Sequence, residues 1–239
     1  MSTRSTFQRH ALAAGIVAAS IVAPAANAQM LEEVIVTATK RAEGLQDVPI
    51  AISVMSGESV QELGMQSMYD VALYMPNVHV NQASAGDQLF IRGVGSGVNY
   101  GFEQSVGTFI DNVYYGRGRT AKSRFLDIER VEVLKGPQST LFGKNTIAGA
   151  INITTKRPTD EFEGYVDARY RTELEGYALE GVVSGPLSDN VRARLTARYY
   201  EDDGYVNNPN PGEPNGGTRE DSTVRLVVAV DLRETLSLS

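Results

Sequence analysis

The sequence contains no cysteine and no tryptophan, and its only histidines are His10 and His79. Without cysteine, a disulfide framework and a thiolate metal site are both excluded. With so few histidines, a multi-histidine metal centre is excluded, and a secreted enzyme would lack the paired nucleophile and base of covalent catalysis. No spaced pair of carboxylates stands out either. We therefore expect a protein that is not an enzyme and that holds no cofactor or metal, with His79 at the surface.

The sequence also lacks an excess of positive charge and lacks a long apolar run. Its 22 basic and 29 acidic residues give a net charge of −7, which argues against a nucleic-acid partner. The longest apolar run, Ala11–Ala23, has 13 residues, whereas a membrane-spanning helix needs ~20. This run follows Arg4 and Arg9 and precedes Ala26-Asn27-Ala28. The arrangement predicts a secretory signal over residues 1–28, which is removed after Sec export.

Two segments follow this signal. Residues 29–47 are expected to be extended and poorly packed, and residues 48–157 to form a compact α+β unit. Within the unit we expect two short helices, one capped by Ser56 and one ended by Pro76. Strands are expected at 50–55, 89–92, 106–113, 128–134 and 148–155, with glycine-rich loops at 93–101 and 116–118. The irregular order of these elements excludes a doubly wound fold.

Residues 158–239 alternate with period two. In Val191–Tyr200 the odd positions are Val, Ala, Leu, Ala and Tyr, and the even positions are Arg, Arg, Thr, Arg and Tyr. The stretches 162–172, 177–183 and 223–232 alternate in a similar way, and a fifth begins at Leu236. Alternate side chains of a strand point to opposite faces of a sheet, so each strand has an apolar face and a polar face. Such strands are typical of an outer-membrane barrel wall and equally of a soluble antiparallel sheet with one wet face. The export signal favours the barrel.

Two glycine-rich stretches resemble nucleotide-binding motifs without matching them. In GPQSTLFGKN, six residues separate Gly136 from Gly143 instead of four, and Asn145 stands where a phosphate loop needs Ser or Thr. GVGSGVNYG lacks the dinucleotide-binding spacing. We therefore expect no nucleotide site and interpret the second stretch as a mobile loop.

Several stretches resemble TonB-dependent outer-membrane receptors. EEVIVTATK, near the mature N-terminus, resembles a TonB box. LFIRGVG, VGTFIDNVYYGRG and IERVEVLKGPQSTLFGKNTIAGAINITTKRP resemble the plug domain. The last block is the most specific, and the resemblance runs from Glu32 to the end of the chain. It implies a plug domain with a mixed four-stranded sheet, followed by the first antiparallel strands of a transmembrane barrel of about 22 strands.

The resemblance also implies functional residues. TonB would bind an extended strand by adding it to a sheet, and the residues are Glu32, Glu33, Val34, Ile35, Val36, Thr37 and Ala38. The apex of the plug would contact a small-molecule ligand, possibly a ferric siderophore, through Asn99, Tyr100, Phe102, Tyr114, Tyr115 and Arg117. These apical residues could equally serve only in packing. Arg92 and Arg130 match plug arginines that pair with barrel glutamates, which would lie beyond Ser239.

The sequence thus predicts a TonB-dependent receptor of the Gram-negative outer membrane, with a signal peptide (1–28), TonB box and linker (29–47), plug (48–157) and four to five barrel strands (158–239). A periplasmic plug-like binding module without transport is the alternative, but it leaves the alternating strands unexplained. Because so few strands cannot close a barrel, we expect that these residues alone neither insert nor transport. Vitamin B12 and glycans are carried in this family as well, so the cargo stays open.

Overall fold

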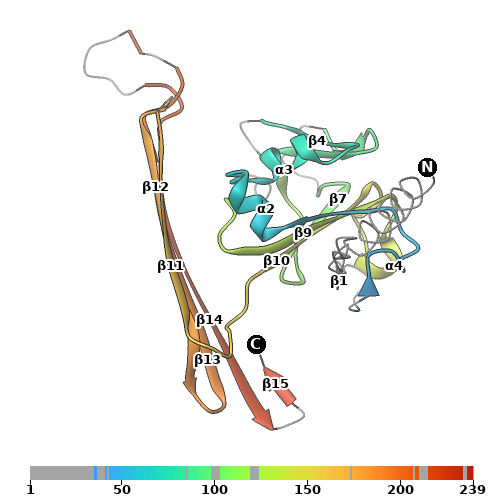
Figure 1. Ribbon diagram of the computed structural model, residues 1–239. Coiled ribbons are helices and arrows are strands. Elements are labelled where there is room, and N and C mark those ends of the chain that lie inside the picture. Colours follow the sequence, from blue (N-terminus) through green and yellow to red (C-terminus); the bar gives the residue numbers. More distant parts are fainter. Residues whose placement is uncertain are drawn as a thin grey trace, which may run out of the picture. The chain divides into compact units, whose positions relative to one another are not determined.

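The computed structural model describes residues 35–36, 41, 43–83, 86–97, 103–118, 124–172, 174–206, 208–209, 215–233 and 236–238. The predicted signal at 1–28 lies outside these ranges. Residues 35–239 cluster as one compact unit, which contains the strands and helices labelled in Figure 1. Among the residues that the structure describes, no helix is both long and apolar enough to cross a membrane.

The first part of this unit is built on a mixed sheet. Its strands are β3 (Ile52–Ser56), β9 (Ile128–Lys135), β10 (Gly149–Thr155), β7 (Val106–Ile110) and β8 (Val113–Tyr115), in that spatial order. β10 pairs with β7 in parallel, and the other pairs are antiparallel. The expected mixed sheet is thus confirmed, with β8 as an additional short strand at its edge.

Two short helices form where they were expected, the first capped by the predicted Ser56 and the second ending two residues before Pro76. The hydroxyl of Ser56 accepts a hydrogen bond from the backbone of Ser59, at 3.1 Å, and α2 (Gly57–Glu62) follows. At α3 (Met68–Tyr74), the Asp70 carboxylate accepts the backbone N–H of Ser67 at 3.0 Å. Such bonds satisfy N–H groups that have no partner inside the helix. α4 (Ser139–Phe142) is a single turn.

A hydrophobic core fixes the helices against the sheet. Val131, Val133 and Ile151 from the sheet are buried with Met68 and Val71 of α3. A smaller cluster contains Phe109, Leu134 and Ala150, with Tyr114 and Phe142 packed against it. A three-stranded sheet made of β4 (Val78–Asn81), β5 (Gln88–Ile91) and β6 (Val94–Gly95) completes this part of the chain.

The single strand expected at 106–113 is in fact a hairpin. β7 ends at Ile110 and β8 begins at Val113, with Asp111 and Asn112 between them at φ angles of 49° and 67°. A two-residue turn with two positive φ angles matches the right-handed twist of the strands, and Asp and Asn tolerate this conformation. The Asp-Asn pair was therefore a turn signal that the apolar pattern on either side obscured.

The second part is the antiparallel sheet β11 (Glu163–Arg171), β12 (Gly176–Ser188), β13 (Val191–Asp202), β14 (Arg219–Arg233) and β15 (Leu236–Leu238), paired in chain order. We call this sheet the strand wall. Its strands appear in Figure 1 as the long orange and red arrows. β12 is longer than expected, because pairing with β13 continues to Ser188. A short β1 (Ile35–Val36) pairs with β2 (Glu43–Gly44).

The strand wall exposes its apolar face. Val166, Leu195 and Leu226 point outward and are 74%, 41% and 64% exposed, whereas the inward-facing Arg194 is 2% exposed. A soluble sheet with one wet face has the opposite arrangement, because its apolar side chains cover a core. The exposed apolar face and covered polar face are those of a membrane barrel wall.

Candidate functional site

The predicted coupling segment is described only at Ile35 and Val36. These residues form β1, with Ile35 opposite Gly44 and Val36 opposite Glu43, and Val36 is fully buried. The segment is extended here, as expected, but it already has a backbone partner and is better packed than its composition predicted. The remaining predicted TonB-binding residues, Glu32, Glu33, Val34, Thr37 and Ala38, lie outside the described residues.

The predicted apex is described at three of its six candidate contacts. Tyr115 and Arg117 are exposed, whereas Tyr114 is half-buried. The Tyr114 ring lies 5.3 Å from that of Phe109, and its hydroxyl accepts a hydrogen bond from Asn145 at 3.1 Å. These contacts give Tyr114 a packing role, whereas the side chains of Tyr115 and Arg117 stay exposed. Asn99, Tyr100 and Phe102 lie outside the described residues.

The backbone around β8 is tied to neighbouring segments. Gln104 N–H donates to the Gly116 carbonyl at 3.0 Å, and Asp87 N–H donates to the Gly118 carbonyl at 3.2 Å. A Cβ on Gly118 would overlap the Asp87 carbonyl oxygen, so this close approach requires glycine. The apical hairpin is therefore held by main-chain bonds on both sides, while its exposed side chains stay accessible.

The two predicted latch arginines differ in their surroundings. Arg130 contacts Glu129 and donates to Glu132 at 3.0 Å, and Glu132 is fully buried and also accepts from Asn152 at 2.8 Å. Arg130 therefore neutralises an acid of the plug itself. Arg92 occupies a two-residue turn between β5 and β6 with φ of 53°. Together with burial, its positive charge lowers the pKa of Lys135.

The described residues contain a further ionic group, the Asp127 cluster, which the sequence did not indicate. It consists of Asp127, just before β9, and Glu163, Arg194, Thr196 and Arg225 of the strand wall. Arg194 donates to both Asp127 carboxylate oxygens, at 2.6 and 2.7 Å, and to Glu163 at 2.6 Å. Thr196 and Arg225 donate to Asp127 Oδ2 at 2.9 and 3.1 Å. The two acids and two arginines balance in charge.

Burial and charge oppose each other at Asp127. Burial alone would raise the pKa of its carboxyl, but the hydrogen bonds from Arg194 and Thr196 and the charges of Arg194 and Arg225 lower it below 3.8. A carboxylate with a lowered folded-state pKa contributes stability that is present above its unfolded pKa and is lost as pH falls through the folded value. The Asp127 cluster is therefore fully formed at neutral pH.

The Asp127 cluster is one end of a longer contact. Along β13, the inward side chains Arg194, Arg198 and Tyr200 meet successive residues of the segment 124–127. Arg198 donates to the Phe125 carbonyl at 2.8 Å, and the Arg124 guanidinium lies 3.6 Å from the centre of the Tyr200 ring. Arg124 also pairs with Asp221 of β14 at 2.8 Å. The plug segment 124–127 thus lies along the polar face of the wall.

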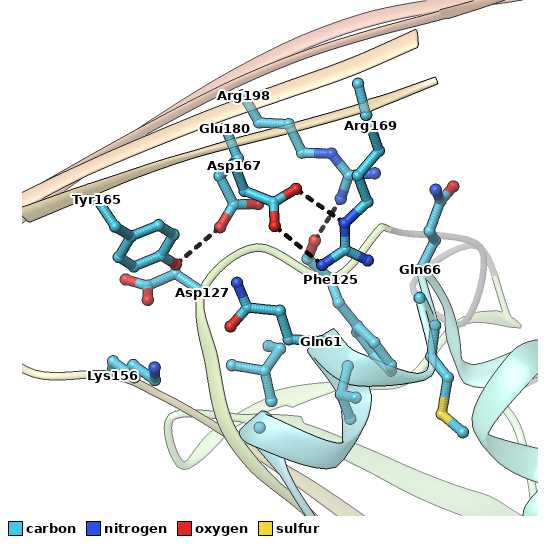
Figure 2. Close-up of a pocket in the computed structure, with 16 residues that line it drawn as sticks. Gln61, Gln66, Phe125, Asp127, Lys156, Tyr165, Asp167, Arg169, Glu180 and Arg198 are labelled. Carbon is cyan, nitrogen blue, oxygen red and sulfur yellow. Dashed lines mark hydrogen bonds and ion pairs between the residues drawn. The ribbon is translucent and has the colours of Figure 1, made fainter. Parts of the chain in front are cut away.

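A cavity of about 80 Å³, lined by both polar and apolar side chains, lies beside this contact. Figure 2 shows Tyr165 and Arg169 of β11, Glu180 of β12 and Arg198 of β13 lining it opposite Gln61 and Gln66 of the plug. Tyr165 donates to Glu180 at 3.1 Å, and Arg169 donates to Asp167 on its own strand at 2.8 Å. The polar groups on the wall side of this cavity could bind ordered water. Among the described residues, no group of three or more acids and histidines is placed to hold a metal.

These observations define a class of protein. An α+β domain is bonded to the polar face of a strand wall whose apolar face points outward, as in outer-membrane proteins whose lumen holds a plug. Residues 44–150 match the TonB-dependent Receptor Plug Domain, and the chain belongs to the TonB-dependent receptors, as the sequence motifs predicted.

Several named receptors are similar in sequence to most of this chain. The chain is 28% identical to the pesticin receptor of Yersinia pestis over 86% of its own length and 32% of the receptor's. It is 30% identical to the ferripyoverdine receptor of Pseudomonas aeruginosa over 72% and 21% of the respective lengths. The crystal structure of the ferric yersiniabactin uptake receptor of Yersinia pestis has the same fold, with a TM-score of 0.69 and 24% identity over 76% of this chain and 29% of that one. The chain thus spans about a third or less of these proteins, which are named as receptors and not as enzymes.

Proposed function

We propose that this chain is the N-terminal part of an outer-membrane receptor that takes up a scarce ligand actively, with TonB as its energy-coupling partner. The observation that carries the proposal is the plug bonded through residues 124–127 to a wall with an outward apolar face. A seated plug blocks free passage, so transport needs a source of work. The outer membrane has no nucleotide supply, and mechanical coupling through an extended peptide provides an alternative.

A ferric siderophore is the proposed ligand class. Relatives with up to 30% identity are named for ferripyoverdine and ferrioxamine B. On the described part of the apex, Tyr115 and Arg117 offer an exposed ring and a cation, which suit a partly aromatic or anionic chelate. Arg92 and Arg130 remain proposed latches toward barrel glutamates.

Energy would enter through the strand at Glu32–Ala38. In the structure, Ile35 and Val36 pair with Glu43 and Gly44, so the segment already adopts the extended conformation that β-augmentation uses. TonB would either replace β2 or add to the opposite edge of β1. Most of the affinity would come from main-chain hydrogen bonds and little from individual side chains.

The test is a proline substitution in the receptor made by its native cells. Ile35→Pro removes a backbone N–H and is poorly tolerated inside a paired strand. We expect ligand binding at the cell surface to persist and uptake to fail. Ile35→Ala is the matched control and should do much less, because it keeps the N–H. Normal uptake by the proline variant would show that Glu32–Ala38 is not the coupling strand.

A further inference from the structure

We propose that Asp127 is the residue that seats the plug on the strand wall. The fastening has a charge polarity opposite to the one that the sequence suggested, because the plug supplies the acid and the wall supplies the arginines. The proposal assigns Asp127 a positioning role. Its binding partners on the wall are Arg194, Thr196 and Arg225. It concerns only the seating of the plug, and it holds whichever ligand is carried and whether or not TonB binds at Glu32–Ala38.

The first argument is geometric. The Asp127 carboxylate accepts four hydrogen bonds from three side chains of two wall strands, and two of these come from one guanidinium as a bidentate pair. Bidentate pairing fixes orientation as well as distance. Arg225 also donates to the Asp127 backbone carbonyl at 3.1 Å. A rotation or shift of the plug against the wall would therefore break several bonds together.

The second argument is burial. The side chains of Asp127 and Arg194 are 0% and 2% exposed. Surface ion pairs contribute little, but a buried charge that loses its partner is left in a medium that solvates it poorly. Removal of Asp127 would leave the buried Arg194 with only the half-exposed Glu163, and removal of Arg194 would leave the buried Asp127 without its bidentate partner.

The third argument is the backbone. Asp127 has a φ of 54°, a left-handed conformation that costs energy for a residue other than glycine and that Asp tolerates better than most. Its carbonyl also accepts the Lys156 N–H at 2.9 Å, at the end of β10. Gly57, at the start of α2, approaches the neighbouring Ile128 carbonyl so closely that a Cβ would overlap it. The strained residue is therefore held in place from the plug side, with its carboxylate directed at the wall.

Arg130 differs from Asp127 in its ion pairs, because it binds Glu129 and Glu132 of its own strand. Glu163 extends the Asp127 cluster to a third wall strand, because Arg194 binds it at 2.6 Å. One arginine therefore joins the plug to the first strand after it, and the seat includes the point where the chain passes from plug to wall.

The experiment compares Asp127→Asn with Asp167→Asn in the receptor made by its native cells. Asp167 is a wall acid beside the same cavity, but its ion pair is with Arg169, two residues along its own strand. We expect Asp127→Asn to raise amide hydrogen exchange in residues 124–134 at least tenfold. Cells that carry this variant should also become permeable to a large hydrophilic antibiotic that cells with the unchanged receptor exclude. Asp167→Asn should change neither quantity.

A second set of variants separates seating from general destabilisation. Arg194→Gln alone leaves Asp127 with Arg225 and Thr196, whereas the double variant Asp127→Asn/Arg194→Gln removes both buried charges. If Asp127 and Arg194 act together, the exchange rate of the double variant should rise by a smaller factor than the two single-variant factors multiplied together. Arg225→Gln is the milder variant, because Arg225 is 23% exposed, and it should raise amide exchange at 124–134 by a smaller factor. It keeps the proposal testable if Asp127→Asn prevents assembly. Unchanged exchange at 124–134 in the variants that assemble, or an equal rise for Asp167→Asn, would overturn the proposal.

Discussion

At the scale of single residues, similar ionic side chains serve different purposes according to what surrounds them. Arg130 faces a buried acid of its own sheet, so its charge stabilises the plug internally. Arg194 faces a buried acid of another segment 67 residues away, so the same guanidinium chemistry joins two parts of the molecule. The residue type alone did not separate these roles, because the burial of each arginine and its acid partner depends on the folded chain.

Arg130→Gln is expected to destabilise the plug by about 3 kcal/mol, because the buried Glu132 would lose the guanidinium that donates to it at 3.0 Å. The change is measured as faster hydrogen exchange at the paired strands β9 and β10. Glu129→Gln is the control. It removes the exposed partner of Arg130, and exposed pairs contribute less than about 1 kcal/mol. Equal effects of the two substitutions would mean that the Arg130–Glu132 pair is not important for the plug.

At the scale of elements, the alternation of the wall strands carries the most information. Strand register places Leu195 opposite Leu226 and Thr196 opposite Arg225. Because the side-chain period is two, a shift of one residue would turn outward side chains such as Leu195 and Leu226 toward the plug and Arg194 outward. The outward tyrosines Tyr177 and Tyr199 both donate to Glu201, at 2.5 and 2.8 Å. Outward aromatic side chains near the ends of strands are typical of the aromatic girdle of a membrane barrel.

Leu226→Glu is expected to reduce the amount of assembled receptor in the outer membrane. The side chain is outward and 64% exposed, and an acidic group on the lipid face costs up to about 2 kcal/mol. The matched control is Thr223→Glu, on the inward face of the same strand and opposite Arg198. Heat-modifiable receptor is measured in membrane fractions. If Thr223→Glu reduces it as much as Leu226→Glu does, the two faces have been assigned incorrectly.

At the scale of the whole molecule, the strand wall is an open sheet in which β11 and β15 each have one edge without a strand partner among the described residues. Lipid does not tolerate unpaired backbone N–H and C=O groups. The plug covers the polar face of the wall but provides no strand for either edge, since its own sheets are separate. The five described strands of the wall therefore do not close on one another.

Cells that express only residues 1–239 are accordingly expected to yield no heat-modifiable, membrane-integrated product, since a closed barrel needs at least ~8 strands. The measurement is the gel mobility of membrane fractions with and without heating. The receptor expressed from its native locus serves as the positive control. A heat-modifiable band from the short chain would contradict the expectation.

Several features could be predicted from the sequence because local patterns determine them. The period of two determined the wall strands and their two faces, Ser56 determined the start of α2, and the block that begins at Ile128 identified the plug. The hairpin at Asp111-Asn112 was also encoded locally, but its turn signal lay within a continuous apolar run. The family assignment rests on such contiguous motifs, so it needed no tertiary structure.

The tertiary structure alone decided which charges meet. Asp127 and Arg194 are far apart in sequence, and neither neighbourhood predicts the other, because ion pairs at long range follow from how a plug and a wall pack. The assignment of Arg130 to Glu132 and of Tyr114 to packing came from burial, which a sequence expresses only on average. The sequence thus determined the strands, their faces and the family, through short-range periodicity and motifs. The packing of separate segments determined the seat of the plug, because desolvation and partner geometry exist only in the folded chain.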